Sequence, residues 1–403
     1  MKNTLYDVVV IGGGIHGAGV AQAAAAKGYS VLVLEQNQIA SGTSSKSSKL
    51  IHGGLRYLET LQFSLVKECL FEREMLLQNA PDLVKHQAFY IPIYKKAKRG
   101  SFKVKLGLWL YAWLGGFRKN VRFKKIPRSQ WKELDGLDTE NLKAVYQYWD
   151  AQTDDTALTT SVMNSALELG AKLCMPAIFM FAFRKKDHYV VEYLHKGQTY
   201  HCQAKTVINA AGPWANDVLG KTHPVIPQIQ TQLIQGTHIL LDGDIKQGVY
   251  YAEAPSDKRP VFVIPWKDKI MVGTTETLHH GHPSECKPKV EERAYLLETL
   301  SYYFPKFRST QTARISDAFS GLRVLPHTQG SYNKRARDTI LDVDNAKDPR
   351  FLTIYGGKLT AYRITSEKAL ATLQKNLPIP TPKADLRRTK LKPGPLHAQP
   401  YQC

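Results

Sequence analysis

The stretch YDVVVIGGGIHGAGVAQAAAAKGYSVLVLE, residues 6–35, decides how the rest of the chain is interpreted. The consecutive aliphatic residues at 8–11 predict a strand that is buried on both faces, as in a parallel sheet. The alanine-rich segment that follows predicts a helix ended by Gly28, and VLVL predicts a second buried strand. The stretch is therefore a βαβ unit, and it predicts an α/β fold with a Rossmann-like nucleotide-binding domain.

Three glycines mark the joint between the first strand and the helix. Gly12, Gly14 and Gly17 form a G-x-G-x-x-G motif, and Glu35 ends the second strand. The first glycine permits the turn, the second lets the backbone approach a pyrophosphate, and the third lets helix and strand pack closely. The helix N-terminus favours the phosphate charge, and Glu35 can accept both hydrogen bonds of an adenosine ribose. The motif therefore predicts a dinucleotide site, for NAD or FAD.

The segment IASGTSSKSSKLIHGG, residues 39–54, follows this unit directly. A nucleotide-binding domain for NAD continues into another regular crossover after its ribose acid, whereas this segment is rich in small hydroxyl residues. Such residues can lie along an extended cofactor and donate hydrogen bonds without steric conflict. A flexible surface loop is the alternative interpretation. The position directly after the glycine motif favours a cofactor loop, and the length favours FAD.

Composition places the chain among globular proteins. It has 403 residues, of which 43% are hydrophobic and 22% are charged, enough for two domains. Lys and Arg number 55 against 35 Asp and Glu, giving a net charge of +20. This excess favours an acidic partner, which could be a nucleic acid, an anionic membrane surface or a phosphorylated substrate.

The cysteines do not suggest a structural role. There are five, scattered along the chain and never spaced as a C-x-x-C pair: Cys69, Cys174, Cys202, Cys286 and Cys403. This pattern disfavours a disulfide framework and a zinc site, and we expect no metal. It is typical of a protein from a reducing compartment.

The chain shows no targeting or membrane-spanning signal. The N-terminus enters a predicted strand within six residues, which leaves no room for a signal peptide. The longest apolar run, at 106–117, is far shorter than the ~20 residues that cross a bilayer. We therefore expect a cytoplasmic protein that is not secreted and has no integral span.

Residues 95–125 contain eleven Lys or Arg and no acid. Trp109, Tyr111, Trp113 and Phe117 lie among apolar neighbours between the basic clusters. This pattern suits a peripheral position in the headgroup region of an anionic membrane, here the cytoplasmic face of the inner membrane. The alternative is a core helix with a solvated, charged rim.

Periodicity predicts the remaining elements in outline. Helices are predicted at 60–80, 154–170, 290–304 and 359–376, and strands within 176–209 and at 236–241, 247–252, 261–266 and 270–275. The last 28 residues contain six prolines and predict a mostly extended tail.

Several motifs together resemble the FAD-dependent glycerol-3-phosphate dehydrogenases, the aerobic, quinone-linked family. They are VVVIGGGIHGAGVA, TSSKSSKLIHGGLRYLE, NAAGPWA, VFVIPW with VGTTE, SGLRVLP and YGGKLTAYR, in the same order as in that family. The resemblance covers roughly residues 5–390. It implies oxidation of sn-glycerol 3-phosphate to dihydroxyacetone phosphate in glycerol metabolism, with electrons passed to quinone or, in some members, to oxygen.

The resemblance also implies a D-amino-acid oxidase-like fold, with an FAD domain of the glutathione reductase type and a substrate domain built on an antiparallel sheet. We expect an FAD-binding domain from residues 1–90, 150–225 and 315–380, a substrate domain from 91–149 and 226–314, and a tail at 381–403.

The resemblance implies a set of residues around non-covalent FAD. With the glycine motif and Glu35, the expected cofactor-binding residues are Thr43, Ser44, Ser45, Ser48, Lys49, Leu50, Gly53, Ala211, Gly212, Gly357, Lys358, Leu359 and Thr360. His52 is expected to be a residue of the flavin loop, although related flavoproteins sometimes attach FAD covalently through such a position.

The resemblance further implies a substrate site in which basic residues converge. The expected substrate-binding residues are Arg56, Tyr57, Arg323, Arg337 and Lys358, and the expected catalytic residues are His238, Arg323, Lys358 and Arg56. A phosphate dianion needs several charge-assisted donors. Oxidation also requires loss of a hydroxyl proton, and histidine titrates near the working pH, so His238 is our candidate for the base.

Members of the family usually continue into a helical C-terminal domain that this sequence does not include, which leaves the oligomeric state and the electron acceptor open. One alternative is an FAD-dependent oxidase or dehydrogenase of another small hydroxy acid or an amine. Such an enzyme would need a binding site for the carboxylate group of its substrate. Another is a flavoprotein whose basic face binds RNA. No RNA-binding motif appears outside 95–125, so we expect no nucleic-acid partner.

Overall fold

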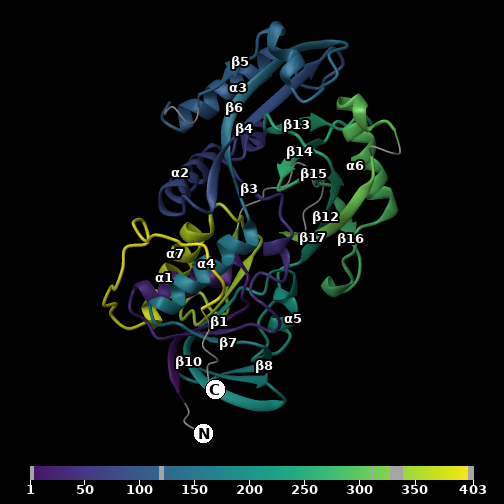
Figure 1. The fold of residues 1–403 in the computed structure, drawn as a ribbon. Coiled ribbons are helices and arrows are strands. Elements are labelled where there is room, and N and C mark those ends of the chain that lie inside the picture. Colours follow the sequence, from purple (N-terminus) through teal and green to yellow (C-terminus); the bar gives the residue numbers. More distant parts are fainter. Residues whose placement is uncertain (1–3, 118–121, 310–312, 327–338, 398–403) are drawn as a thin grey trace.

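The structure is a computed structural model, and it describes residues 4–117, 122–309, 313–326 and 339–397. Two β-sheets organise these residues, and they lie one above the other in Figure 1. The first sheet contains the predicted βαβ unit, and the second is mainly antiparallel.

The first sheet is built around β1 (Leu5–Ile11). β2 (Val31–Leu34) lies parallel to β1 on one side and β10 (Gln198–Asn209) lies parallel to it on the other, so the βαβ unit is confirmed. Beyond them, β7 (Lys172–Cys174) pairs with β2 and β19 (Phe351–Tyr355) pairs with β10, both in parallel. The carboxyl ends of these strands therefore meet at one edge, where a doubly wound sheet binds its ligand.

Shorter strands extend this sheet at its sides. β8 (Ala177–Arg184) and β9 (Tyr189–His195) form an antiparallel meander with β10 and confirm the strands predicted within 176–209. β11 (Thr222–His223) pairs with β8 at one edge, and β18 (Ile340–Val343) pairs with β19.

Helices cover both faces of the first sheet. α1 (Ile15–Ala26), α4 (Asp155–Glu168) and α7 (Tyr362–Leu373) pack on one face, and α5 (Ala215–Leu219) packs on the other. Val8 of β1 belongs to the core beneath the first three helices, whereas its neighbour Val9 belongs to the core beneath α5. Alternate residues of β1 thus enter two different cores, which explains its continuous aliphatic run.

The second sheet is almost entirely antiparallel. Its strand order is β16 (Thr277–His279), β12 (Thr231–Asp242), β15 (Lys269–Gly273), β14 (Pro260–Trp266), β13 (Val249–Glu253), β4 (Val84–Tyr94), β6 (Leu142–Thr153) and β3 (Leu50–Ile51), with β17 (Ile315–Pro326) on β12 and β5 (Lys124–Lys125) on β6. Only β13 and β4 pair in parallel among these described strands.

The sheets divide the chain differently from our expected domain segments at more than one place. We expected residues 1–90 in the FAD-binding domain, but β3 and β4 belong to the second sheet. We assigned 315–326 to the FAD-binding domain, but β17 pairs antiparallel with β12 along most of its length. The physical reason lies in the neighbouring strands. The parallel position beside β10 is occupied by β19, and the long strand β12 offers β17 an antiparallel partner.

Three helices pack on the second sheet. α6 (Val290–Tyr303) covers one face, and α2 (Phe63–Asn79) and α3 (Ser101–Leu114) cover the other. α3 buries Leu108 and Tyr111 against the sheet, while Trp109 and Trp113 on its outer face are about half exposed.

Short segments complete the described structure. Short 3-10 helices occur at Thr43–Ser45 (η1), Leu55–Thr60 (η2), Arg128–Glu133 (η4), Gly212–Trp214 (η5), Pro283–Glu285 (η6), Pro305–Phe307 (η7) and Gln374–Asn376 (η9). The described part of the Pro-rich tail contains no helix or strand, and Leu391 in it is buried on the first core, with its N–H bonded to Asn79. Within the described ranges, no helix is long and apolar enough to cross a membrane.

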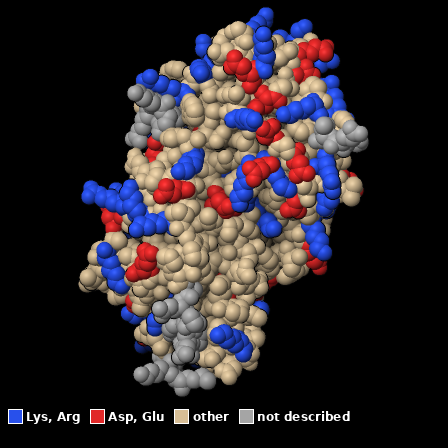
Figure 2. All heavy atoms as spheres, viewed as in Figure 1, with Lys and Arg blue, Asp and Glu red and all other residues tan. Residues whose placement is uncertain are grey.

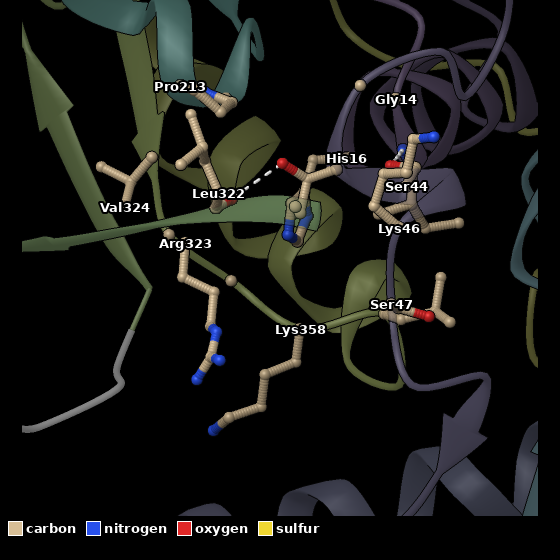
Figure 3. Close-up of a pocket in the computed structure, with 18 of the residues that line it drawn as sticks. Gly14, His16, Ser44, Lys46, Ser47, Pro213, Leu322, Arg323, Val324 and Lys358 are labelled. Atoms are coloured by element: carbon tan, nitrogen blue, oxygen red, sulfur yellow. Dashed lines mark hydrogen bonds between the residues drawn. The ribbon is translucent and has the colours of Figure 1, made fainter. Parts of the chain in front are cut away.

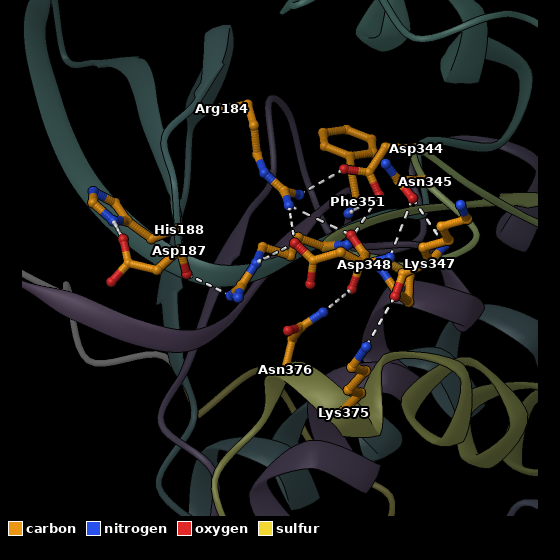
Figure 4. A network of polar contacts seen from close by, with 12 residues as sticks. Arg184, Asp187, His188, Asp344, Asn345, Lys347, Asp348, Phe351, Lys375 and Asn376 are labelled. Carbon is orange, nitrogen blue, oxygen red and sulfur yellow. Dashed lines mark hydrogen bonds and ion pairs between the residues drawn. The ribbon is translucent and has the colours of Figure 1, made fainter.

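A polar network fixes the turn between β18 and β19 to the meander (Figure 4). Asp344 Oδ2 accepts hydrogen bonds from Arg184 Nη1 and Tyr189 Oη, both at 2.8 Å. Asp344 Oδ1 accepts the backbone N–H groups of Arg350 and Phe351 at 2.9 and 3.0 Å. One carboxylate therefore ties β8 and β9 to the strand that leads into the 356–360 loop.

Charge is distributed over the surface. Figure 2 shows that, on the face it presents, Asp and Glu side chains lie among the Lys and Arg side chains. The net charge of +20 therefore does not form one continuous basic patch on this face.

Candidate active site

A cavity of about 880 Å³ lies between the two sheets. Its walls come from the glycine-motif turn at 12–16, the loop at 41–48, the loop at 210–214, β17 and the loop at 356–360. Figure 3 shows these segments converging from opposite sides. The cavity therefore lies at the carboxyl edge of the parallel strands, where the sequence predicted a ligand.

The glycine motif has the close contacts that its residue types require. Gly12 has a φ of +105°, in the region that favours glycine, and a Cβ there would lie 2.7 Å from the carbonyl oxygen of Ala210. A Cβ on Gly17 would lie 1.8 Å from the carbonyl oxygen of Gly12. α1 begins after Gly14, and its first turn contains no acidic residue. The N-terminus of α1 therefore has no acidic side chain in its first turn that would repel a phosphate group.

Glu35 holds the turn from the end of β2. Its Oε2 accepts the N–H of Gly13 at 2.6 Å and its Oε1 accepts the N–H of Asn37 at 2.7 Å. Burial raises the pKa of Glu35, and these backbone hydrogen bonds act in the opposite direction. The carboxylate lines the cavity and can also reach a ribose there.

Residues of the hydroxyl-rich loop face in two directions. Ser44 Oγ accepts the N–H of Ile15 at 2.8 Å, and Thr43 Oγ1 donates to Leu322 on β17 (Figure 3). In contrast, Lys49 turns away from the cavity, where its Nζ bonds Asp155 at the start of α4 at 2.5 Å. The loop is therefore anchored beneath the cavity by an ion pair and presents hydroxyl groups to it.

Basic residues from distant parts of the sequence reach the same cavity. Arg56 lies on η2, Arg323 on β17 and Lys358 on the loop after β19. Figure 3 shows the side chains of Arg323 and Lys358 extending in the same direction. The ammonium group of Lys358 lies over the ring of Tyr57, 4.5 Å from its centroid. The structure therefore brings together four of the five predicted substrate-binding residues.

A carboxylate lies among these cations. Glu276 Oε1 accepts a hydrogen bond from Arg323 Nη1 at 2.9 Å and lies 3.9 Å from Arg56 Nη1. Arg323 Nη2 also donates to the backbone oxygen of Thr275 at 2.9 Å, so the guanidinium is held at two points. Three positive charges, with that of Lys358, and one negative charge leave a local net charge of about +2.

His238 on β12 is almost completely buried beside these groups. Its Nε2 shares a 2.9 Å hydrogen bond with Ser48 Oγ, and its ring stacks on Phe319 with centroids 4.9 Å apart. Burial, together with the nearby charges of Arg323 and Lys49, lowers the pKa of His238 to about 3. The imidazole is therefore neutral at neutral pH and can accept a proton.

Comparison with known proteins identifies the family of the chain. A family described as FAD dependent oxidoreductase matches residues 7–363. The chain belongs to this family. The predictions of an enzyme, of a D-amino-acid oxidase-like fold and of FAD rather than NAD are thereby confirmed.

Relatives of this FAD-dependent oxidoreductase span most of its length. A glycerol-3-phosphate dehydrogenase from Pseudomonas aeruginosa is 36% identical and the match covers 92% of this chain and 72% of the relative. A D-erythritol 1-phosphate dehydrogenase from Brucella abortus is 33% identical, covering 92% and 74%. The solved glycerol-3-phosphate dehydrogenase from Bacillus halodurans with FAD has a TM-score of 0.76 and 27% identity, covering 97% of this chain and 68% of that one. The predicted family resemblance is confirmed.

Residues of the cavity fit FAD. His16, in the glycine-motif turn, is half-buried, and its Nδ1 atom is buried without a hydrogen-bond partner among the described residues. Burial lowers the pKa of His16 to about 4, so it offers a neutral donor or acceptor. A Cβ on Gly357 would lie 2.0 Å from His16 Nε2, so glycine is required for the close approach of that loop. Buried polar groups without protein partners, glycine cradles and loop hydroxyls are what an extended, polar cofactor needs.

Most of the predicted site residues line the cavity. They are Gly12, Gly14, Glu35, Thr43, Ser44, Ser48, Leu50, His52, Arg56, Tyr57, Ala211, Gly212, His238, Arg323, Gly357, Lys358, Leu359 and Thr360. Gly17, Ser45, Lys49 and Gly53 do not line it. These four residues contact neighbouring protein groups instead, so they can act on a bound cofactor only through those groups. Arg337 lies outside the described residues.

The cavity residues that sequence reasoning missed include His16, Arg259 and Glu276. His16 stands inside the glycine motif, and Glu276 ends the VGTTE stretch, but neither position was weighed for its own chemistry. Arg259 Nη1 donates to the backbone oxygen of Glu276 at 3.0 Å, while its Nε pairs with Asp257. For His16 and Glu276, the signal that could have identified them is a polar residue within a quoted motif.

Proposed function

We propose that this FAD-dependent oxidoreductase oxidises sn-glycerol 3-phosphate to dihydroxyacetone phosphate. The observation that carries the proposal is the convergence of Arg56, Arg323 and Lys358 beside the buried, neutral His238 in one cavity. The names of the relatives support the same activity.

The cations account for recognition of the phosphate group. Arg56, Arg323 and Lys358, reduced by the charge of Glu276, leave a local charge of about +2, which matches a phosphate dianion. Because Glu276 and the backbone of Thr275 fix the Arg323 guanidinium, its remaining donor directions are set before substrate arrives. An uncharged polyol would leave the positive charge of these half-buried groups unneutralised, so the site should reject it.

His238 accounts for the proton. When bound, FAD supplies the acceptor for the hydride that leaves C2 of the substrate. The C2 hydroxyl must lose its proton in the same reaction, and a neutral imidazole can take it. We expect the proton to be held at Nε2, because this atom shares a hydrogen bond with Ser48, whose side chain also lines the cavity.

A second candidate substrate is D-erythritol 1-phosphate. The match to the Brucella abortus D-erythritol 1-phosphate dehydrogenase is as extensive as the matches to glycerol-3-phosphate dehydrogenases. Both substrates carry a phosphate monoester and a neighbouring secondary hydroxyl, so the same cations and the same base serve either. The substrate class is therefore a small phosphorylated polyol.

We also propose that the electrons pass to a quinone at an anionic membrane surface. Phe102, Leu106, Trp109 and Trp113 form one exposed face of α3, with between 51% and 79% of each side chain exposed. Basic residues flank them and the 95–125 segment has no acid, which favours anionic lipid as the partner of this face. Sedimentation with vesicles should show more binding to anionic than to neutral lipid. Equal binding of wild type and W109D/W113D would contradict this face.

The substrate proposal is tested by flavin reduction. The purified holoprotein is mixed anaerobically with sn-glycerol 3-phosphate, D-erythritol 1-phosphate, glycerol or glycine while the visible flavin band is followed. We expect bleaching by at least one phosphate ester and none by glycerol or glycine. The faster of the two esters identifies the substrate. Bleaching by glycine alone would overturn the proposal in favour of an amino-acid oxidase activity.

A further inference from the structure

A buried polar network lies beneath the turn that leads into the substrate site. Tyr111, on the inner face of α3, accepts the backbone N–H of Gly53 at 2.8 Å through its hydroxyl oxygen. The same hydroxyl donates to the carboxylate of Asp150, with oxygen–oxygen distances of 2.8 and 2.9 Å. Arg73 forms an ion pair with Asp150, and all three side chains are about 1% exposed or less. None of these three side chains lines the cavity.

The turn fits this network so tightly that only glycine can occupy it. A Cβ on Gly53 would lie 2.5 Å from the hydroxyl oxygen of Tyr111 and 2.6 Å from the side chain of Leu70. Gly54 has a φ of +76°, and a Cβ there would lie 2.3 Å from the ring of Tyr57. The turn is therefore packed between Tyr111 on one side and Tyr57, which lines the cavity, on the other.

The chain enters the substrate site immediately after this turn. η2 begins at Leu55, and Arg56 and Tyr57 on it line the cavity. Lys358 lies over the ring of Tyr57, and Arg56 lies 3.9 Å from Glu276. A shift of the turn would therefore move Arg56 and Tyr57 and change their contacts with Glu276 and Lys358.

We propose that the hydroxyl of Tyr111 is a positioning group that sets the place of Arg56 and Tyr57 through Gly53. Burial and the neighbouring Asp150 raise the pKa of Tyr111 well above its usual value, so the hydroxyl keeps its proton. It therefore always donates to Asp150, and its oxygen remains available to the Gly53 N–H. The inference rests on the proposed function, in which Arg56 binds the substrate phosphate.

We expect the hydrogen bond between Tyr111 and Gly53 to affect substrate binding more than the rate of the chemical step. Arg56 would neutralise a phosphate that is charged in both the ground state and the transition state, so loosening it weakens both equally. A loss of such uniform binding raises KM and leaves kcat unchanged. The alternative acceptor for the Gly53 N–H is Asp150 Oδ1 at 3.4 Å, a long contact that would hold the turn less firmly.

The test compares Tyr111→Phe with Tyr90→Phe in the holoprotein. The Tyr111→Phe change keeps the ring and removes the hydroxyl. Tyr90 is a matched control because it is a buried tyrosine on β4, in the sheet that α3 covers, accepts one hydrogen bond from Gln147 at 3.1 Å and does not line the cavity. For Y111F we expect KM for the phosphate ester to rise about fivefold to tenfold with kcat within a factor of about two, the size of one lost hydrogen bond.

Hydrogen exchange supplies a readout that does not depend on turnover. In Y111F the amide of Gly53 should exchange faster than in wild type, whereas Y90F should leave it unchanged. Unchanged KM together with unchanged exchange at Gly53 would overturn the inference. If Y111F lowers kcat and thermal stability no differently from Y90F while KM is unaltered, Tyr111 is only structural and the inference also fails. If no phosphate ester reduces the wild-type flavin, the proposed function fails, and the exchange result alone decides whether Tyr111 holds the turn.

Discussion

Burial makes His238 an unusual histidine. Its pKa, lowered to about 3, keeps the ring uncharged at neutral pH, but such a group is a weak base before substrate arrives. The lowering is due to burial first and to Arg323 and Lys49 second. A phosphate dianion in the cavity would offset these cations and raise the pKa again. The base therefore becomes stronger when the substrate is in place.

Replacement of His238 by asparagine should separate chemistry from binding. Asparagine can still form a hydrogen bond with Ser48 but cannot take up a proton at neutral pH. We expect kcat to fall by a factor of about 10² to 10⁴, with KM and FAD content close to wild type. Steady-state kinetics and the flavin absorbance of the purified variant measure these quantities. A variant that retains full kcat would show that another group takes the proton.

Two histidines with lowered pKa values, His16 and His238, should also make stability depend on pH. The pKa values of His16 and His238 are about 4 and 3 in the folded protein, below the value of about 6.5 in the unfolded chain. The unfolded state therefore binds protons that the folded state does not, so stability is full above pH 6.5 and falls as the pH drops toward 4. Each histidine should contribute a slope of up to about 1.4 kcal/mol per pH unit in this range.

Urea unfolding of the holoprotein between pH 7.5 and 5 measures this dependence. The H238N variant should lose one histidine's share of the slope. Identical slopes for H238N and wild type would contradict a lowered pKa at His238.

At the scale of elements, Asp344 joins parts of the first sheet that are distant in sequence. The carboxylate is largely buried and accepts hydrogen bonds from Arg184, Tyr189 and two backbone N–H groups (Figure 4). Asp344→Ala should lower the free energy of unfolding by about 2–4 kcal/mol, since it leaves these donors unpaired. Asp348→Ala is the control and should cost less, because Asp348 is more exposed. Denaturant unfolding measures both, and equal losses would contradict the role given to Asp344.

The sequence predicted the elements whose signals are local. The glycine motif, both strands of the βαβ unit and the helices after it follow from spacing within about thirty residues. The pairing of β17 with β12 was not predicted, because strand partners depend on which neighbouring positions are already occupied. The opposite directions of Ser48 and Lys49 were not predicted either, since they follow from a φ of +58° at Lys49 and from Asp155, more than one hundred residues away.

The same limit explains the site residues. Arg323 and Lys358 were predicted because each stands in a motif that resembles a family with a phosphorylated substrate, and His238 was predicted from the same resemblance. Glu276 was missed because its importance comes from where Arg56 and Arg323 end in space. Periodicity cannot show that two arginines separated by more than 260 residues meet at one carboxylate.

At the scale of the whole molecule, the cavity joins the two sheets through the cofactor site. Residues of both sheets line it, so FAD bound there would contact both. Removal of FAD should therefore lower the unfolding temperature of the whole protein rather than of one part. Free FAD at about one hundred times its dissociation constant should restore about 2.7 kcal/mol. Calorimetry of apoprotein and reconstituted protein tests this, and an unchanged transition on removal would contradict it.

The order of strands along the chain has a consequence for how the molecule is made. The chain contributes to the first sheet at 5–34, 172–223 and 340–355, and to the second at 50–153 and 231–326. Neither sheet can be completed until its last segment has left the ribosome. The strands that are synthesised first therefore have unpaired edges until their partner strands emerge. Because the segments of the two sheets alternate, a gene cut between any two of them would leave both pieces without strands that their sheets need. Co-expressed halves should therefore assemble, while either half alone should aggregate.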